Sequence, residues 1–402
     1  MLGSIRRVSG HDGRERALIV THSYYVRDTR PRRHATALAE AGWDVEVLCA
    51  RDEGEPKNER IGPVTIRRLP ARRRRGSKFR YVFEYGSFGA MAWAAMARMH
   101  AQRRYDLVYV FGIPNLLVRA AAVPKLAGAR VILDVRDPMP EFFMSKYGLT
   151  ADHRLVRALL TEERISCRYA SQIVTVHEAM KELLLRTGVP PEKIGVVFNA
   201  PDPRVFGAPV AGPARDPDDR TMLYAGTVAG RYGLSMLVTA VARLKDAIPG
   251  LRLRIVGDGD LIPAMQRNAR ALGISDRVAF DGPVSLDRIP GIVRSSWVGV
   301  QPHLQDPLMR LTLPTKVLEW AALGLPVICS RTEPLSQTFD DRDMTMITPG
   351  AYEELLAALV EAHRDPRALA AKAARAKESV RRKFDWSEER RALIEIANRP
   401  QR

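Results

Sequence analysis

The sequence has few cysteines and no long hydrophobic run. Its 402 residues include three cysteines, Cys49, Cys167 and Cys329, which lie far apart in apolar contexts. No pair of them has the spacing of a metal motif, so we expect buried thiols in a reducing compartment. The most membrane-like stretch, residues 85–97, is uncharged but too short to span a bilayer.

Acidic residues are also scarce relative to basic ones. There are 63 Lys and Arg against 46 Asp and Glu, which gives a net charge of +17. Such an excess favours an anionic partner, namely a nucleic acid, a phosphorylated substrate or an acidic lipid. The length suits two large domains. Residues 1–16 lack an apolar core segment, so we expect a loose tail over residues 1–15 and no signal peptide.

Strand and helix patterns alternate along both halves of the chain. This alternation predicts an α/β fold with two parallel-sheet domains, which bind ligands beyond the carboxyl ends of their strands. The segment 204–220 is rich in Pro, Asp, Gly and Ala, as linkers are. We therefore expect a first domain over 16–203, a second over 221–372 and a C-terminal helical segment over 373–402.

The most informative stretch runs from Leu313 to Ile328 (LPTKVLEWAALGLPVI). It predicts a loop with Pro314, a helix that ends at Gly324, and a buried strand. A helix N-terminus suits a phosphate, and Lys316 there opposes the helix dipole, which suggests that an anion binds. Glu319 lies near the same face, where it could accept hydrogen bonds from sugar hydroxyls. The alternative is an ordinary amphipathic helix with a solvated Lys and Glu.

Three loops of the second half follow predicted strands. The first, GTVAGRYG over 226–233, has glycines that permit close approach to a phosphate, and Arg231 could supply charge. The second contains Gly257 and Asp258; a tight turn fits it better than a metal site. The third, over 281–284, could pair with a nucleobase edge.

The first half carries acidic and basic residues at equivalent places. Asp137 and Glu141 lie in a Pro-rich loop after a predicted strand, which favours acceptor binding or base catalysis. The alternative is a solvated acidic loop. Asp28 and Arg30, in the first strand–helix unit, could also face the ligand.

Taken together, these segments resemble a GT-B glycosyltransferase of the family-4 type, and the resemblance covers nearly the whole chain. The motifs that carry it are Tyr224-Ala-Gly-Thr, Val256-Gly-Asp-Gly, Phe280-Asp-Gly, the Pro-x-Lys-x-x-Glu helix, Asp28-Thr-Arg and Asn199-Ala-Pro-Asp. Each motif is weak alone, whereas their order and spacing together are specific.

The resemblance implies two Rossmann-like domains with parallel sheets that face a central cleft. It implies retaining transfer from a nucleotide-diphosphate sugar (UDP, GDP or TDP unresolved) to a hydroxyl acceptor, with no obligatory metal or cofactor. Its catalytic positions are Asp137, Glu141, Arg231 and Lys316, and its acceptor positions are Tyr24, Asp28 and Arg30. Its donor positions are Gly226, Thr227, Arg231, Gly257, Asp258, Gly282, Val284, Leu313, Pro314, Thr315, Lys316 and Glu319. The last helix is expected to return to the first domain, with Trp386 at the crossing.

The sequence departs from the family pattern in three places. Leu311 stands where the first Glu of Glu-x7-Glu is usual, and Thr227 and Tyr232 replace a basic pair. The first loop has Ser-Tyr-Tyr at 23–25 in place of Gly-Gly. Arg231 and Lys316 could compensate for the lost charge. A degenerate binding protein and another GT-B activity, such as an epimerase or phosphorylase, are the alternatives.

A basic stretch precedes an aromatic one. Residues 67–80 contain eight basic residues and no acidic one, and residues 81–99 are rich in aromatic residues, Ala and Met. This combination is typical of an interfacial membrane helix. It predicts a cytoplasmic protein attached to the inner face of the cell membrane, with a lipid-linked acceptor. The alternatives are a core helix beside a loop, nucleic-acid binding, and a soluble secondary-metabolite acceptor. The oligomeric state stays open.

Overall fold

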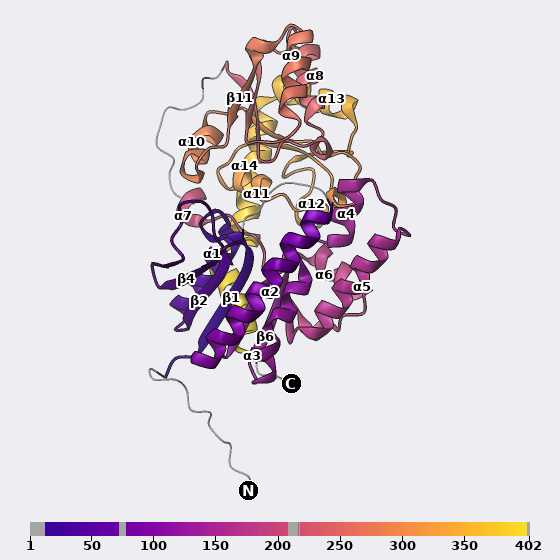
Figure 1. The fold of residues 1–402 in the computed structure, drawn as a ribbon. Coiled ribbons are helices and arrows are strands. Elements are labelled where there is room, and N and C mark those ends of the chain that lie inside the picture. Colours follow the sequence, from indigo (N-terminus) through magenta and orange to yellow (C-terminus); the bar gives the residue numbers. More distant parts are fainter. Residues whose placement is uncertain (1–12, 72–77, 208–215, 217, 400–402) are drawn as a thin grey trace. The chain divides into compact units, whose positions relative to one another are not determined.

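The computed structural model describes residues 13–71, 78–207, 216 and 218–399, and its chain divides into two units (Figure 1). Unit 1 comprises residues 1–198 and 387–402, and unit 2 comprises residues 199–386. Each unit is built on its own, mainly parallel sheet with its own hydrophobic core. The predicted α/β class with two parallel-sheet domains is therefore confirmed.

The sheet of unit 1 has the strand order β3-β4-β2-β1-β5-β6-β7-β8, in which only the β3–β4 pair is antiparallel. Its strands are β1 (Arg16–Tyr24), β2 (Asp44–Ala50), β3 (Asn58–Ile61), β4 (Val64–Leu69), β5 (Leu107–Phe111), β6 (Arg130–Val135), β7 (Gln172–Thr175) and β8 (Ile194–Val196). β1, β5 and β6 are almost completely buried, as expected for parallel strands covered on both faces. The chain order reverses between β1 and β5, and such a switch point is where open sheets bind ligands.

The helices of unit 1 connect these strands. They are α1 (Thr29–Glu40), α2 (Lys78–Gln102), α3 (Ala122–Leu126), α4 (Met139–Tyr147), α5 (Arg154–Tyr169), α6 (Glu178–Arg186) and most of α15 (Trp386–Asn398). α15 is tied to this unit by Glu389, whose Oε2 accepts from the Phe198 amide at 2.7 Å. Gly195 leaves room for the Ile396 side chain, which a Cβ would displace.

The sheet of unit 2 has six parallel strands in the order β11-β10-β9-β12-β13-β14. They are β9 (Arg220–Ala225), β10 (Leu251–Val256), β11 (Val278–Gly282), β12 (Val298–Gln301), β13 (Val327–Ser330) and β14 (Thr345–Ile347). The helices are α7 (Pro203–Phe206), α8 (Leu234–Leu244), α9 (Ile262–Ala271), α10 (Ile289–Arg294), α11 (Thr315–Ala322), α12 (Glu333–Thr338), α13 (Tyr352–Arg364) and α14 (Pro366–Lys383). Here the chain order reverses between β9 and β12, which places the switch point at their carboxyl ends.

Several elements differ from the sequence-based expectations. The hairpin β3–β4 was not predicted, and the Pro-rich loop after β6 turns directly into α4, whose second position, Pro140, suits a helix start. The predicted helix over 115–127 is split into a 3-10 turn and the short α3. Within the described residues, no helix is long and apolar enough to cross a membrane.

Two of the basic residues in the 67–80 stretch belong to the fold. Arg67 and Arg68 lie on β4, where Arg67 pairs with Glu46 at 2.5 Å and Arg68 pairs with Glu59 at 2.6 Å. Arg68 is 2% exposed. The block of four arginines at 72–75 lies outside the described residues.

A buried ion pair joins α1 to the sheet of unit 1. Arg30 Nε donates to Asp134 Oδ2 at 3.0 Å, and Arg30 Nη1 donates to the Val197 carbonyl at 2.8 Å. Asp134 is completely buried and also accepts from the Tyr109 hydroxyl at 2.8 Å. His34 stands beside this group, and burial together with the nearby arginines holds its pKa well below the usual value. Arg30 is therefore committed to the interior of unit 1.

We expect Arg30→Met to destabilise unit 1 by about 3–5 kcal/mol, because it leaves the Asp134 carboxylate buried without its cation. Urea unfolding at neutral pH measures this loss. Adding Asp134→Leu to the variant should restore part of the stability. Arg32→Met, on the exposed side of the same helix, should change the free energy of unfolding by about 0.5 kcal/mol or less. Equal effects of the Arg30 and Arg32 variants would contradict this account.

Candidate active site

The carboxyl ends of β9, β10 and β11 bring three of the predicted loops together in unit 2. The Gly226 amide donates to the Val256 carbonyl at 2.8 Å, and the Gly257 amide donates to the Gly282 carbonyl at 2.9 Å. Gly226 and Gly257 have φ angles of +133° and +138°, which only glycine adopts readily. A Cβ on Gly257 would overlap the Gly226 carbonyl. The glycines thus let the three loops close into a surface of bare backbone.

Lys316 lies above this surface. Its Nζ is 4.2 Å from the ring centroid of Tyr224 and 5.3 Å from that of Tyr232. A Cβ on Gly226 would come within 2.6 Å of the ammonium. The Tyr224 ring is fixed from below, because it is buried and its hydroxyl donates to the Thr227 carbonyl at 2.6 Å. The ammonium is therefore held by two aromatic faces.

The electrostatics of Lys316 are unusual. Loss of solvent lowers the pKa of the ammonium to about 7, and the Glu319 carboxylate opposes this shift. The charge also stands in the first turn of α11, where the helix dipole disfavours a cation. Pro314 precedes this turn and offers no side-chain cap to its amide groups. An anion placed there would relieve both the ammonium and the helix terminus.

The other predicted donor residues surround this point. Arg231 lies on a short 3-10 turn, with its guanidinium 5.7 Å from the Tyr232 ring. Asp258 is exposed, and its Oδ1 accepts from the Gly259 amide at 2.8 Å, as in a tight turn. Glu319 is partly buried, one turn after Lys316, and Leu311 is a buried apolar side chain. Thr227 and Thr315 are exposed.

The remaining predicted donor positions lie at or just after the end of β11 and before α11. Gly282, at the end of β11, has a φ of +69°, and Val284 follows it two residues later. Leu313 and Pro314 lead into α11. The structure therefore brings the predicted residues of unit 2 to one edge of the sheet, around Lys316.

Sequence reasoning missed one residue of this edge, His303. It lies two residues after the end of β12, it is 1% exposed, and its ring centroid lies 5.7 Å from that of Tyr232. Burial and the charge of Lys316 lower its pKa to about 3, so its ring is neutral at physiological pH. Its place after a strand, next to the switch point, was the signal that could have identified it.

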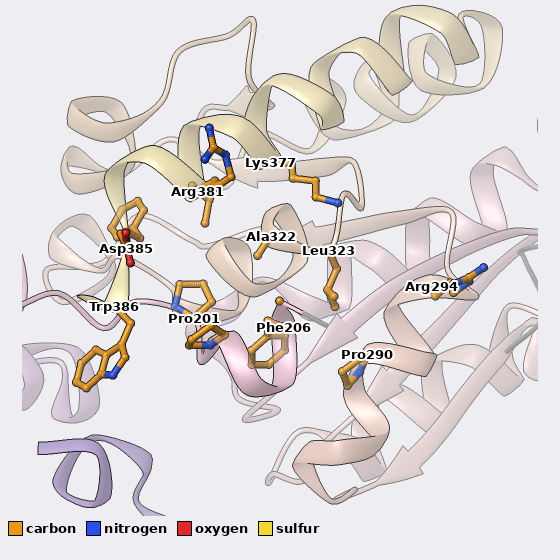
Figure 2. A pocket seen from close by; sticks show the side chains of 14 residues that line it. Pro201, Phe206, Pro290, Arg294, Ala322, Leu323, Lys377, Arg381, Asp385 and Trp386 are labelled. Carbon is orange, nitrogen blue, oxygen red and sulfur yellow. The ribbon is translucent and has the colours of Figure 1, made fainter. Parts of the chain in front are cut away.

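A large hollow of unit 2 lies at the other end of α11. It has a volume of about 830 Å³. Its lining includes Ala322 and Leu323, and Figure 2 shows Lys377, Arg381 and Arg294 around them. None of the predicted donor residues lines it. Lys316 lies in the first turn of α11, whereas this hollow lies at the C-terminal end of the same helix.

In unit 1, charged residues gather after β1 and β6. Arg136 Nη1 donates to both Asp28 oxygens, at 3.2 and 3.0 Å. Burial raises the pKa of Asp137, although the neighbouring Arg136 opposes this. Tyr24 is partly buried, with the Arg27 guanidinium 5.6 Å from its ring.

Glu141 lies in the first turn of α4 and is 8% exposed. Behind it, on α5, Glu163 is 1% exposed, and its Oε2 has no hydrogen-bond partner among the described residues. Burial, together with the charges of Glu141 and Glu162, raises the pKa of Glu163 to about 8. Glu163 therefore carries a proton at neutral pH.

Comparison with known proteins identifies the family. Residues 28–200 match the model of the glycosyl transferase 4-like domain, and residues 219–365 match that of the glycosyl transferases group 1. The chain therefore belongs to the family-4-like glycosyltransferases with the GT-B fold, a family of transferase enzymes.

Individual relatives are distant. A 2-deoxystreptamine N-acetyl-D-glucosaminyltransferase from Streptomyces fradiae is 25% identical over 79% of this chain and 77% of its own length. Two other curated relatives match over shorter stretches, and the chain spans 47% and 38% of their length.

Solved structures share the fold over almost the whole chain. Sucrose-phosphate synthase from Thermosynechococcus elongatus has a TM-score of 0.77 at 19% identity and covers 95% of this chain and 98% of its own. The Anabaena protein HepE in complex with UDP has a TM-score of 0.68 at 13% identity, with coverages of 95% and 98%.

The low pKa of Lys316 predicts a pH-dependent stability in the absence of ligand. Between about pH 7 and pH 10.5 the unfolded chain binds more protons at this lysine than the folded chain, so the free energy of unfolding should rise with pH there. Below pH 7 this contribution is flat. Lys316→Met should remove the rise and should stabilise the protein most at pH 6.

Urea unfolding of unit 2 at pH 6, 8 and 10 measures the effect. Lys377→Met, which removes an exposed lysine from α14, serves as the matched control and should keep the wild-type slope. An unchanged slope in Lys316→Met would show that this lysine does not cause the pH dependence.

Proposed function

We propose that the protein transfers a sugar from a nucleotide-diphosphate donor to a hydroxyl acceptor, with retention of the anomeric configuration; the hydroxyl proton passes to the leaving diphosphate or to a carboxylate beside the acceptor. The observation that carries this proposal is the Lys316 ammonium, held over the Gly226 backbone at the first turn of α11. It stands at the switch point of a parallel sheet, and within the described part of the chain it forms no salt bridge, although the Glu319 carboxylate acts on it from one turn away. The structure of HepE with UDP, a protein of the same fold, supports a nucleotide donor.

In this proposal, binding and chemistry are divided among named residues. Lys316, Arg231 and the first turn of α11 bind the diphosphate, and Glu319 binds the ribose. The bond between the anomeric carbon and the diphosphate oxygen breaks, and a bond to the acceptor oxygen forms. The leaving diphosphate gains negative charge, which these cations stabilise most in the transition state.

We assign the acceptor to unit 1. Asp137 or Glu141 contacts the acceptor hydroxyl, and Asp28 and Tyr24 are further candidates. Arg30 is not included, since its donors are engaged with Asp134 and Val197 inside the unit. No obligatory metal or cofactor enters the proposal.

The first test is a thermal-shift screen with UDP, GDP, TDP, ADP and CDP and their sugar conjugates. A ligand at about 100 times its dissociation constant adds about 2.7 kcal/mol to the free energy of unfolding. We expect one base to be selected. No shift with any of them, backed by calorimetry at millimolar ligand, would refute a nucleotide-sugar donor site.

With the selected donor, Lys316→Ala should lower kcat/KM by about 10²- to 10³-fold, because it removes a charge aimed at the leaving group. Its stability without ligand should not fall. Lys377→Ala, at the far end of the neighbouring hollow, should retain wild-type kinetics. Unchanged kinetics in Lys316→Ala would remove this lysine from the mechanism.

We further propose that the acceptor is lipid-linked and that α2 contacts the membrane from the cytoplasmic side. Four exposed residues of α2, namely Phe83, Gly86, Ala90 and Trp93, are three or four residues apart and so share one face. Phe83 is 75% exposed and Trp93 is 49% exposed. Large apolar side chains on one helix face, next to a basic stretch, favour an anionic lipid surface.

Vesicle co-sedimentation tests this contact. The double variant Phe83→Ser/Trp93→Ser should bind vesicles with one third phosphatidylglycerol at least about tenfold more weakly, since each buried aromatic contributes about 1.5–3 kcal/mol. The control Leu272→Ser removes an exposed apolar side chain of unit 2 and should bind as wild type. Equal binding of all three proteins would favour the soluble metabolite as acceptor.

A further inference from the structure

The loop after β12 contains two neighbouring buried polar atoms without a partner. His303 Nδ1 and Gln301 Oε1 make no hydrogen bond among the described residues, although His303 is 1% exposed and Gln301 is completely buried. Buried polar atoms of native proteins are almost always paired, so each exception calls for an explanation. His303 also lies close enough to Lys316, the cation of the proposed mechanism, to feel its charge.

The hydrogen bonding around His303 fixes where its proton is. Gln301 Nε2 lies 2.6 Å from His303 Nε2. With the Gln301 amide nitrogen facing the ring, this nitrogen donates and His303 Nε2 accepts, which puts the proton of the neutral ring on Nδ1. In this arrangement Nδ1–H is a buried donor without an acceptor among the described residues.

The backbone of His303 is held firmly. Its carbonyl accepts from Ser330 Oγ at 3.0 Å and from the Gly350 amide at 3.0 Å. The next amide, that of Leu304, donates to the Arg231 carbonyl at 3.0 Å. The loop is therefore tied to β13, to the chain before α13 and to the 3-10 turn that carries Arg231.

The surroundings of the ring point to an anion. Tyr232 is close to both His303 and Lys316, with its ring centroid 5.7 Å from that of His303 and 5.3 Å from Lys316 Nζ. The positive charge of Lys316 acts on the imidazole and helps to keep it neutral. A neutral N–H donor beside an ammonium suits an oxygen of a group that is already paired with that ammonium.

We propose that His303 Nδ1–H donates a hydrogen bond to an oxygen of the nucleotide diphosphate that Lys316 binds. This inference rests on the proposed function and adds a residue to the donor site. The diphosphate supplies the missing acceptor, and the bond strengthens as the leaving group gains charge. Gln301 acts as a positioning residue, because its amide holds the tautomer that leaves the proton on Nδ1.

Two variants with a carboxamide side chain distinguish the roles of the two ring nitrogens of His303. His303→Asn places an amide near the position of Nδ1, whereas His303→Gln carries it toward the position of Nε2. His303→Phe keeps a ring without any donor. Calorimetric titration with the selected nucleoside diphosphate and with the corresponding nucleoside then compares binding with and without phosphate.

We expect His303→Phe and His303→Gln to bind the diphosphate about tenfold or more weakly, as for the loss of a hydrogen bond to a charged group. Binding of the nucleoside should change by less than about threefold, and His303→Asn should recover most of the lost affinity. If His303→Phe does not fold, the Asn and Gln variants still give the comparison.

The outcomes distinguish this inference from the proposed function. A wild-type protein that binds no nucleotide overturns both. If wild type binds and Lys316→Met binds weakly, but the three His303 variants bind as wild type, the inference about His303 alone is wrong. If the His303 variants lose equal affinity for the nucleoside and for the nucleoside diphosphate, the inference is also wrong, because His303 would then not act on the phosphates.

Discussion

The Lys316 ammonium has two aromatic faces around it, a bare glycine backbone beneath it and the unfavourable end of a helix dipole behind it. The aromatic faces attract the cation, whereas the helix dipole and the loss of solvent disfavour it, and burial lowers its pKa to about 7. The loops after β9, β10 and β11 need their glycines to close around this point. A site built this way has its polar groups in place before the ligand arrives, which reduces the reorganisation needed during reaction.

In unit 1, by contrast, buried charges form ion pairs with one another. Arg30 and Asp134 compensate each other in the core, and Arg136 is paired with Asp28. On α5, Glu163 is also buried, and burial raises its pKa to about 8, so it carries a proton at neutral pH.

The sequence predicted which residues come together in the fold better for unit 2 than for unit 1. Glycines, Lys316 and Glu319 appear in short, ordered motifs, and strand periodicity placed each motif at the same edge of the sheet. Arg30 also lies in a motif, but no local pattern shows that its partner is Asp134, 104 residues away. Arg67 and Arg68 likewise looked like part of a basic arm, because the hairpin that brings the Glu59 carboxylate beside Arg68 was not predicted. His303 was missed since its neighbours come from β13 and from the loops around Arg231 and Gly350.

The sequence by itself determined the alternation of strands and helices, the two-domain division, the family resemblance and the motifs of the donor site. These depend on local periodicity and on residues close together in the chain. Only the tertiary structure decided which charges are compensated, because ion pairing depends on distances between residues far apart in sequence. It committed Arg30 to the core. Among the residues that the structure describes, it left Lys316 without a salt bridge and the buried His303 Nδ1 without a hydrogen-bond partner. Desolvation, which sets the pKa of each of these groups, is likewise a property of the folded chain.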